Sequence, residues 1–393
     1  MAYAKYLLQA LLASGLALAA SKCDGTDKPI TIQSQGDADE LGGCSTIKGD
    51  ISFHEEAAGD FTFSSIQKIE GSLIARGAAN VTSISAPQLR SIGDTFELQG
   101  LLRLTSLAFD ELTSVGSIKF AALPELQGLQ FTKGVTDAGS VSITNTGLVN
   151  LNGIELKTVG DFDITANKAL EEINVNNLKN STGLFNIAAN SPKLKVDLPN
   201  LAEGKNMTFR NTSDVQIPSL KSLTGQLAFI AVDQETIRAP NLTECGDLSL
   251  DNNRNLNNIS FPRLTTINGG LSITNNSELT DIRGFPNLEK VTGAVDAVGK
   301  FEHVDFPALE QVSGGFNVQS NNDFDCSQFD DLRDNDAIQG VYECKANESN
   351  PTSLDGTSTG DGDSEESEDA AISNLVPPTG LTALVCGLLA LLM

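Results

Sequence analysis

The chain has 393 residues, of which 51 are acidic and 26 are basic, and its formal net charge is −25. Such a charge repels polyanions, so the composition argues against nucleic acid and bare anionic lipid as partners. With 40% hydrophobic residues the chain can bury a substantial core, whereas three Tyr, no Trp and six Cys argue against a sugar-stacking platform and a disulfide-dense scaffold.

Residues 1–19 have the pattern of a secretory signal peptide. Lys5 precedes an apolar run, Tyr6–Ala20, which ends in small residues, and polar residues follow immediately. We therefore expect cleavage near Ala19 or Ala20 and a secreted mature chain.

Residues 20–345 carry a repeat of about 22 residues. Gly246–Ile267 reads GDLSLDNNRNLNNISFPRLTTI, and Gly270–Val291 repeats its order as GLSITNNSELTDIRGFPNLEKV. The first inward apolar residue recurs once in each copy, at Ile30, Ile51, Leu73, Phe96, Ile118, Val141, Phe162, Phe185, Met207, Leu227, Leu248, Leu271, Val295 and Phe316.

Each repeat holds three short apolar patches that alternate with polar residues, and none has a helical stripe, so we expect strands. One such turn cannot bury its own apolar face, whereas stacked turns pair their backbones and close a common core. The sequence thus predicts an all-β fold, a single right-handed parallel β-helix of about 14 turns, about 65 Å long at a strand spacing near 4.8 Å.

The corners of the predicted solenoid are marked by proline and asparagine. Proline lacks a backbone donor and is tolerated at corners, and seven prolines share one repeat position: Pro87, Pro199, Pro218, Pro240, Pro262, Pro286 and Pro307. The asparagines at turn exits are expected to cap corners or to stack as a ladder: Asn145, Asn167, Asn190, Asn253, Asn276 and Asn321.

Cysteines flank both ends of the repeats, where the core of a solenoid would be open. We expect disulfides between Cys23 and Cys44 and between Cys326 and Cys344, and a helix at Ser327–Gln339 that follows Asp325 as its N-cap. Cys245 occupies a position that is Ile267 or Val291 in other repeats, so the sequence favours a buried thiol over a redox role.

Eight Asn-x-Ser/Thr sequons fit a secreted glycoprotein, and each asparagine is a candidate N-glycosylation site: Asn80, Asn180, Asn206, Asn211, Asn241, Asn258, Asn275 and Asn347.

Residues that could carry chemistry are sparse. His54 and His303 lie about eleven predicted turns apart, and no nucleophile, phosphate-loop, dinucleotide, H-E-x-x-H or C-x-x-C motif is present. The acids between Asp323 and Asp336 lack the spacing of an EF-hand loop, so solvated charge is favoured over calcium. We expect no catalytic, cofactor or metal residues.

Residues 346–369 contain no Lys or Arg, are rich in acids, Ser, Thr and Gly, and are predicted to form an unfolded stalk. Residues 370–393 follow the order of a GPI signal, with small residues, a short spacer and an apolar tail too short to span a bilayer. We expect GPI attachment at Asp369, with Ser367, Ser373 and Asn374 as rivals; the alternative is a tail that stays membrane-associated.

Four features of the chain are typical of one family: the opening C-D-G at Cys23–Gly25, the repeated G-x-L-x-I-x-x-N and F-P-x-L-x-x-I strings, the Cys326–Cys344 unit and the GPI tail. In these features the chain resembles the fungal GPI-anchored cell-wall organisation glycoproteins of the Sps2-like group. The repeats of that group are similar to receptor L-domains. The resemblance implies a non-enzymatic surface protein that supports wall integrity and morphogenesis.

The expected partners are the GPI lipid in the outer leaflet of the plasma membrane and wall β-glucan or other wall proteins, and the expected location is the cell surface or wall. The alternatives are a receptor-like module that captures a secreted protein or wall glucan on a sheet face, and a polysaccharide-active β-helix, which the scarcity of basic residues on the predicted sheet face disfavours.

Overall fold

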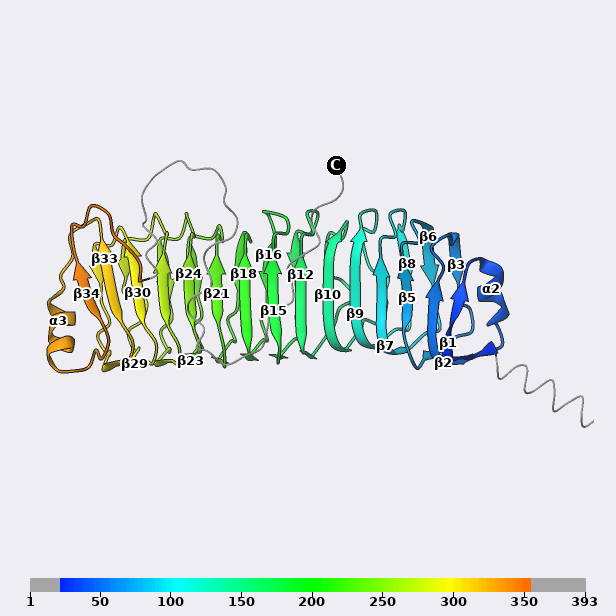
Figure 1. The fold of residues 1–393 in the computed structure, drawn as a ribbon, viewed down its shortest axis with the longest axis horizontal. Coiled ribbons are helices and arrows are strands. Elements are labelled where there is room, and N and C mark those ends of the chain that lie inside the picture. The colour runs from blue at the N-terminus through cyan, green and yellow to red at the C-terminus, as the bar shows by residue number, and fades with distance from the viewer. Residues whose placement is uncertain (1–21, 355–393) are drawn as a thin grey trace, which may run out of the picture.

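The protein is described by a computed structural model that covers residues 22–354. The predicted signal peptide, the predicted GPI attachment residues and most of the predicted stalk lie outside this range. Residues 22–354 form a curved rod of about 15 stacked turns with about 22 residues per turn (Figure 1). The predicted all-β parallel solenoid is therefore confirmed, with one turn more than the fourteen that the repeats suggested.

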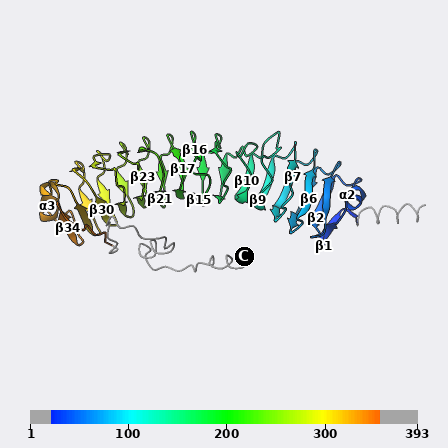
Figure 2. The ribbon, with the colours of Figure 1, turned by 90° about the horizontal axis from the view of Figure 1, so that it is seen from above.

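The large sheet takes a strand from every turn, and all its neighbouring strands pair in parallel. It lies on the concave side of the rod (Figure 2). Its strands are β1 (Asp24–Ile32), β2 (Thr46–Phe53), β4 (Lys68–Ile69), β5 (Leu73–Arg76), β7 (Ser91–Gln99), β9 (Ser114–Leu123), β10 (Asp137–Thr146), β12 (Asp161–Thr165), β15 (Leu184–Ala188), β18 (Asn206–Arg210), β21 (Leu227–Ile230), β24 (Leu248–Asp251), β27 (Leu271–Thr274), β30 (Val295–Gly299), β33 (Phe316–Ser320) and β34 (Tyr342–Lys345).

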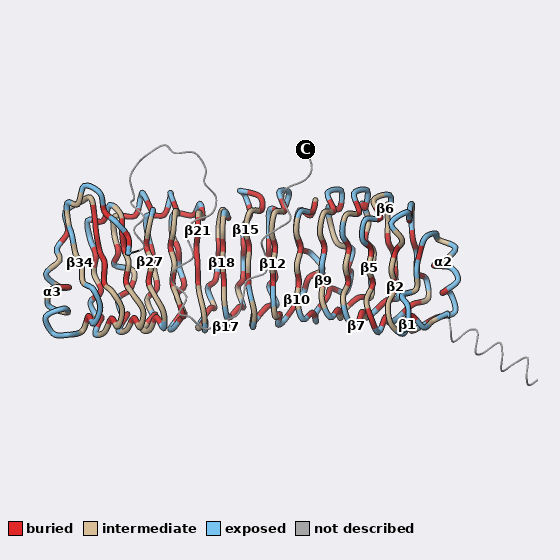
Figure 3. The backbone as a smooth tube through the Cα atoms, in the orientation of Figure 1, coloured by how far each residue is buried: buried red, intermediate tan, exposed pale blue. Residues whose placement is uncertain are grey.

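The register of the large sheet places all fourteen predicted inward residues in one column, from Ile30 to Phe316. Tyr342 of β34 pairs with Phe316 and supplies the fifteenth member. Buried and more exposed residues alternate along the strands (Figure 3), since successive side chains point to opposite faces of the sheet.

Shorter parallel sheets close the other sides of each turn. The longest contains β11 (Thr158–Val159), β14 (Asn180–Ser181), β17 (Glu203–Gly204), β20 (Ser222–Leu223), β23 (Glu244–Cys245), β26 (Thr266–Ile267), β29 (Lys290–Val291) and β32 (Gln311–Val312). The rest form four small sheets: β3 (Ala58–Thr62), β6 (Asn80–Ser85) and β8 (Ser106–Ala108); β13 (Glu172–Ile173), β16 (Lys195–Asp197) and β19 (Asp214–Gln216); β22 (Thr236–Arg238) and β25 (Asn258–Ser260); β28 (Asp281–Ile282) and β31 (His303–Val304).

A glycine column explains much of the glycine content. It stands just before the large-sheet strands, where a Cβ on Gly246 would lie 2.6 Å from the carbonyl oxygen of Gly225, and one on Gly293 would lie 2.6 Å from the backbone of Gly269. Successive turns therefore approach each other too closely at this corner for a side chain.

The opposite corner, at the C-terminal end of the large-sheet strands, is left-handed along the middle of the rod. From the fifth to the twelfth turn the residues here have φ between 51° and 58°: Ala122, Asn145, Ala166, Ala189, Asn211, Ala231, Asn252 and Asn275. Asparagine tolerates this backbone conformation, whereas alanine is strained in it.

The residue after this left-handed corner points into the core, and four of the predicted asparagines lie here as a ladder. Asn167, Asn190, Asn253 and Asn276 are buried, and their side chains bond the backbone of neighbouring turns. Asn145 is instead a left-handed corner residue, and Asn321 bonds the segment after β34. All seven predicted corner prolines lie in turns.

Both ends are capped. Disulfides join Cys23 to Cys44 and Cys326 to Cys344, as expected. The helix expected at 327–339 is shorter, α3 (Ser327–Asp334), because Ile338 pairs with Val312 as an extra bridge. Cys326 is its N-cap residue, and the carboxylate of Asp325 accepts the N–H of Ser327. A second helix, α2 (Gln35–Glu40), was not expected; its signal is the capping box between Ser34 and Asp37.

The expectation that the unfolded stalk starts at residue 346 is wrong for residues 346–354. Residues 346–354 lie against the solenoid and are hydrogen-bonded to it, and Pro351 and Ser353 are buried. The predicted unfolded stretch is thereby restricted to residues 355–369, outside the described range.

Candidate functional site

The large sheet has more strands than any other sheet among residues 22–354, and its outer face is the first surface to consider for binding. From the sixth to the thirteenth turn its central column runs in register through Ser142, Asp163, Asn186, Thr208, Ala228, Ser249, Ser272 and Asp296. These eight side chains are short and none is aromatic, so this part of the face is smooth, whereas the column continues in earlier turns through the longer Lys119 and Glu97.

Carboxylates on this face join one turn to the next. Asp163 accepts a hydrogen bond from the Nδ2 of Asn186 at 2.8 Å, and Asp251 accepts one from the hydroxyl of Thr274 at 2.8 Å. At the edge of the face, Asp247 accepts the N–H of Gly270 at 2.8 Å. These acids satisfy backbone and side-chain donors of neighbouring turns, an arrangement that stabilises the stack.

The acidic residues near the C-terminal cap also have separate partners. Asp325 binds Ser327, which lowers the pKa of that carboxyl, and Asp330 accepts the hydroxyl of Tyr342 at 2.8 Å. Asp323 accepts the Nδ2 of Asn347 at 3.0 Å. Within residues 22–354, no three His, Cys, Asp or Glu side chains gather closely enough to hold a metal ion.

The two histidines lie near opposite ends of the rod. His54 directly follows β2, and its Nδ1 accepts the N–H of Glu56 at 3.2 Å. His303 lies in β31, where it pairs in register with Asp281. The structure therefore does not bring them into one site.

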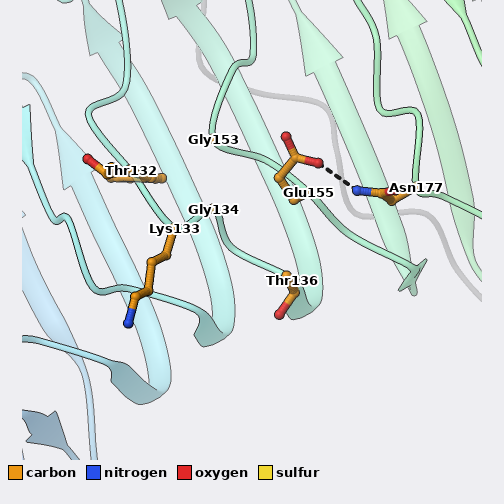
Figure 4. A pocket seen from close by; sticks show the side chains of 8 residues that line it. Thr132, Lys133, Gly134, Thr136, Gly153, Glu155 and Asn177 are labelled. Carbon is orange, nitrogen blue, oxygen red and sulfur yellow. Dashed lines mark hydrogen bonds between the residues drawn. The ribbon is translucent and has the colours of Figure 1, made fainter.

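A shallow depression of about 300 Å³ lies beside the sixth turn (Figure 4). Its polar lining is already paired, since Glu155 accepts the Nδ2 of Asn177 at 2.6 Å and Lys133 donates to Glu111 at 2.6 Å. Gly134 and Gly153 line it with φ of +77° and +95°, so a side chain there would strain the backbone. This arrangement is a gap between irregular turns with no unpaired donor or acceptor set for a ligand.

Cys245 lies in β23 in register with Ile267 of β26, as its repeat position indicated, and it is a fully buried free thiol. Burial, followed by the nearby carboxylates of Asp247 and Glu244, raises the pKa of this thiol to about 12. A neutral, inaccessible thiol of this kind packs as a small apolar side chain.

None of the eight sequon asparagines is buried, but their side-chain amides differ in their hydrogen bonds. Asn241 donates from its Nδ2 to the carbonyl of Pro218 at 2.8 Å and accepts from Arg263 at 3.0 Å. The Nδ2 of Asn275 donates to Asp251 at 3.0 Å. The exposed Asn80, Asn211 and Asn258 have no such side-chain bond in the part of the chain described.

The polar residues missed by the sequence analysis are Asn317 and Gln319 on the outer face of β33, each 1% exposed. Their signal was the alternation Asn-x-Gln-x-Asn from residue 317, where most earlier strands carry Ser, Thr, Asp or Ala. They bind the segment 346–354, which is described below.

No helix among residues 22–354 has the length and apolar character needed to cross a bilayer. A family model described as Ecm33, GPI-anchored cell wall organization protein, matches residues 1–42. No solved structure matches the chain.

Several curated relatives match most of the chain. The chain is 52% identical over 358 residues to the protein ecm33 of Aspergillus fumigatus, which covers 91% of this chain and 89% of the relative. It is 42% identical to a cell surface GPI-anchored protein of Arthroderma benhamiae, over 98% of both chains. It is 30% identical to the cell surface GPI-anchored protein ECM33 of Candida albicans, over 88% of this chain and 84% of the relative.

Proposed function

Since the chain belongs to the Ecm33 family of GPI-anchored cell wall organization proteins, we propose that it is a non-catalytic glycoprotein rod that supports wall assembly from the fungal cell surface. The family places the protein at the cell surface and wall and gives it a role in cell-wall organisation. The absence of catalysis and the identity of any wall partner belong to the proposal.

One observation carries the non-catalytic part of the proposal. On the outer face of the large sheet, acids such as Asp163, Asp247 and Asp251 are bound to donors of neighbouring turns. A general acid and base would need carboxylates that face a common substrate position with their protons free to move. This face instead uses its carboxylates to hold the turns together.

The anchor is proposed at Asp369, with Ser367, Ser373 and Asn374 as rivals, and would attach the rod to the lipid of the outer leaflet. Wall β-glucan or another wall protein is the proposed partner beyond the membrane. The column from Ser142 to Ser272 supports a second function, the capture of a secreted protein, because its side chains are short and, apart from the buried Ala228, polar, which permits close approach of another backbone.

The test compares the full chain with a variant that ends at residue 369. Both are expressed in fungal cells from which the gene for this protein has been deleted. The full chain should restore growth on a wall-binding dye, whereas the truncated chain should be secreted and fail to restore it. Equal rescue by the truncated chain would favour a soluble binder. Release of new reducing ends from wall glucan or chitin by the purified protein would contradict the non-catalytic proposal.

A further inference from the structure

Residues 346–354, here called the strap, leave β34 and cross the outer face of β33 and β30 (Figure 1). At the start of the strap, the N–H of Glu348 donates to the carbonyl of Ser320 at 2.9 Å. At its end, the N–H of Leu354 donates to the Oδ2 of Asp296 at 3.1 Å. The strap therefore runs against the strand direction and back by one turn toward the N-terminus.

Two outward side chains of β33 receive the middle of the strap. The Nδ2 of Asn317 donates to the carbonyl of Thr352 at 2.9 Å, and the Oε1 of Gln319 accepts the N–H of Thr352 at 3.0 Å. Asn317 also donates to Asp296 at 2.7 Å, and the Nε2 of Gln319 donates to the Oδ1 of Asn317 at 2.9 Å. The paired amides of Asn317 and Gln319 hold the strap in one position, because loss of the strap would leave these buried side chains without their partners on Thr352.

Apolar contacts and the restricted backbone of proline also stabilise the strap in this position. Pro351 and Ser353 are buried, and the Leu354 side chain lies over Gly315, where an added Cβ would be 3.5 Å from its Cδ1. Proline also lowers the entropy that the strap loses on ordering. On β27, the strand two turns before β33, the equivalent positions are Ser272 and Thr274, which are too short to bind a crossing backbone in this way.

We propose that the strap fixes the exit of the tether on the concave face beside β30, and that this face is thereby turned toward the surface that holds the anchor. The inference rests on the proposed GPI attachment. Without the strap, the tether would begin at the C-terminal tip of the rod, directly after Lys345 of β34.

The point at which the tether leaves the rod matters because the tether is short compared with the rod. The composition of residues 355–369 predicts an unfolded coil, for which the expected span is about 20 Å. The rod is about 70 Å long at a spacing near 4.8 Å for each of its turns. A tether shorter than the rod transmits the position of its exit to the orientation of the whole molecule.

The experiment uses the full chain, purified with its lipid anchor and inserted into phosphatidylcholine vesicles that contain an energy-acceptor lipid dye. A donor dye is placed on S249C, on the concave face in β24, or on T266C, in β26 of the same turn but in the sheet that contains β17 and β23 on the convex side (Figure 2). The native Cys245 is fully buried, so we expect the dye not to react with it.

We expect stronger energy transfer from position 249 than from position 266, and near-equal transfer in the double variant N317A/Q319A. The matched control S272A/T274A, on the same face but outside the strap, should keep the asymmetry. Equal transfer in the wild type, or an asymmetry that survives release of the strap, would overturn the proposal. Failure of the wild type to stay on vesicles would instead contradict the proposed anchor.

Release of the strap is verified by hydrogen exchange. The amides of Thr352 and Leu354 should exchange at least tenfold faster in N317A/Q319A, while those of β24 and β27 should not change. Should the double variant disturb the solenoid, T352P removes the N–H bond to Gln319 from the strap side alone. It should abolish the asymmetry as well, and retention of the asymmetry in T352P with a released strap would overturn the proposal.

Discussion

The backbone N–H of Asn167 donates to the Oδ1 of Asn190, which lies 23 residues later and one turn along the rod, at a distance of 2.9 Å. Asn190 in turn donates from its Nδ2 to the carbonyl of Ile164 at 2.8 Å, and both side chains are buried. The ladder thus satisfies the backbone at corners where the chain turns out of the large sheet.

Replacement of Asn190 by alanine should lower the free energy of unfolding by about 1–3 kcal/mol, because it leaves buried backbone groups unpaired. Denaturant unfolding of N190A measures the loss. The control is N152A, whose side chain is exposed and should change stability little. Equal effects of the two substitutions would contradict the ladder's role.

Thr212 occupies the ladder position after Asn211, and its buried hydroxyl has no hydrogen-bond partner. Thr212→Val should therefore be neutral or stabilising by up to about 1 kcal/mol. Thr146→Val is the matched comparison, because the Thr146 hydroxyl donates to Asn167 at 2.7 Å, and it should destabilise the protein. Thermal unfolding of both variants tests the sign of each change, and loss of stability in T212V would indicate a partner for that hydroxyl.

Alanines in the left-handed corner column are strained. Ala189 has φ of 56°, so Ala189→Gly should relieve strain and stabilise the protein by up to about 1 kcal/mol, after the greater freedom of glycine in the unfolded chain is subtracted. Ala188→Gly, one residue earlier in β15, should destabilise instead. The same sign for both substitutions in denaturant unfolding would contradict this explanation.

The glycine column should tolerate no Cβ. Gly246→Ala places the new atom 2.6 Å from the backbone of Gly225, so we expect a loss of about 1–3 kcal/mol from overpacking. Gly128→Ala is the control, since nothing lies within 4 Å of its added Cβ. Similar stability of G246A and G128A would show that the turns are spaced more widely than described.

Cys245 predicts a pH effect above neutrality. Because burial raises the pKa of its thiol from the ordinary value of 9.0 to about 12, the folded state retains this proton more tightly than the unfolded state. Its contribution to stability is full below about pH 9 and is lost as the pH rises toward 12. Alkylation of the native protein at pH 8.5 should therefore be slow and should follow unfolding, and rapid native labelling would contradict the burial.

Much of the fold was predictable because the repeat is local and regular. The column from Ile30 to Phe316 follows directly from the spacing of apolar residues, and the position of Cys245 follows from the same alignment. The terminal disulfides follow from the need to close an open core.

The features that were missed depend on contacts outside one repeat. The strand β34, which begins at Tyr342, adds a fifteenth turn although no repeat motif precedes it, because β33 offers an unpaired edge. Residues 346–354 have the composition of an unfolded stalk, and they are ordered by Asn317 and Gln319 from a strand about 30 residues earlier. Composition alone could not predict that residues 346–354 are ordered, because the residues that bind them lie on another turn.

The central claim, a folded rod held at the fungal cell surface through its C-terminal anchor, is tested most directly by release from intact cells. The full chain should stay with the cells until they are treated with phosphatidylinositol-specific phospholipase C or with glucanase, and the variant ending at residue 369 should appear in the medium untreated. Full-length protein found free in the medium, or a truncated variant retained by the cells, would contradict the claim.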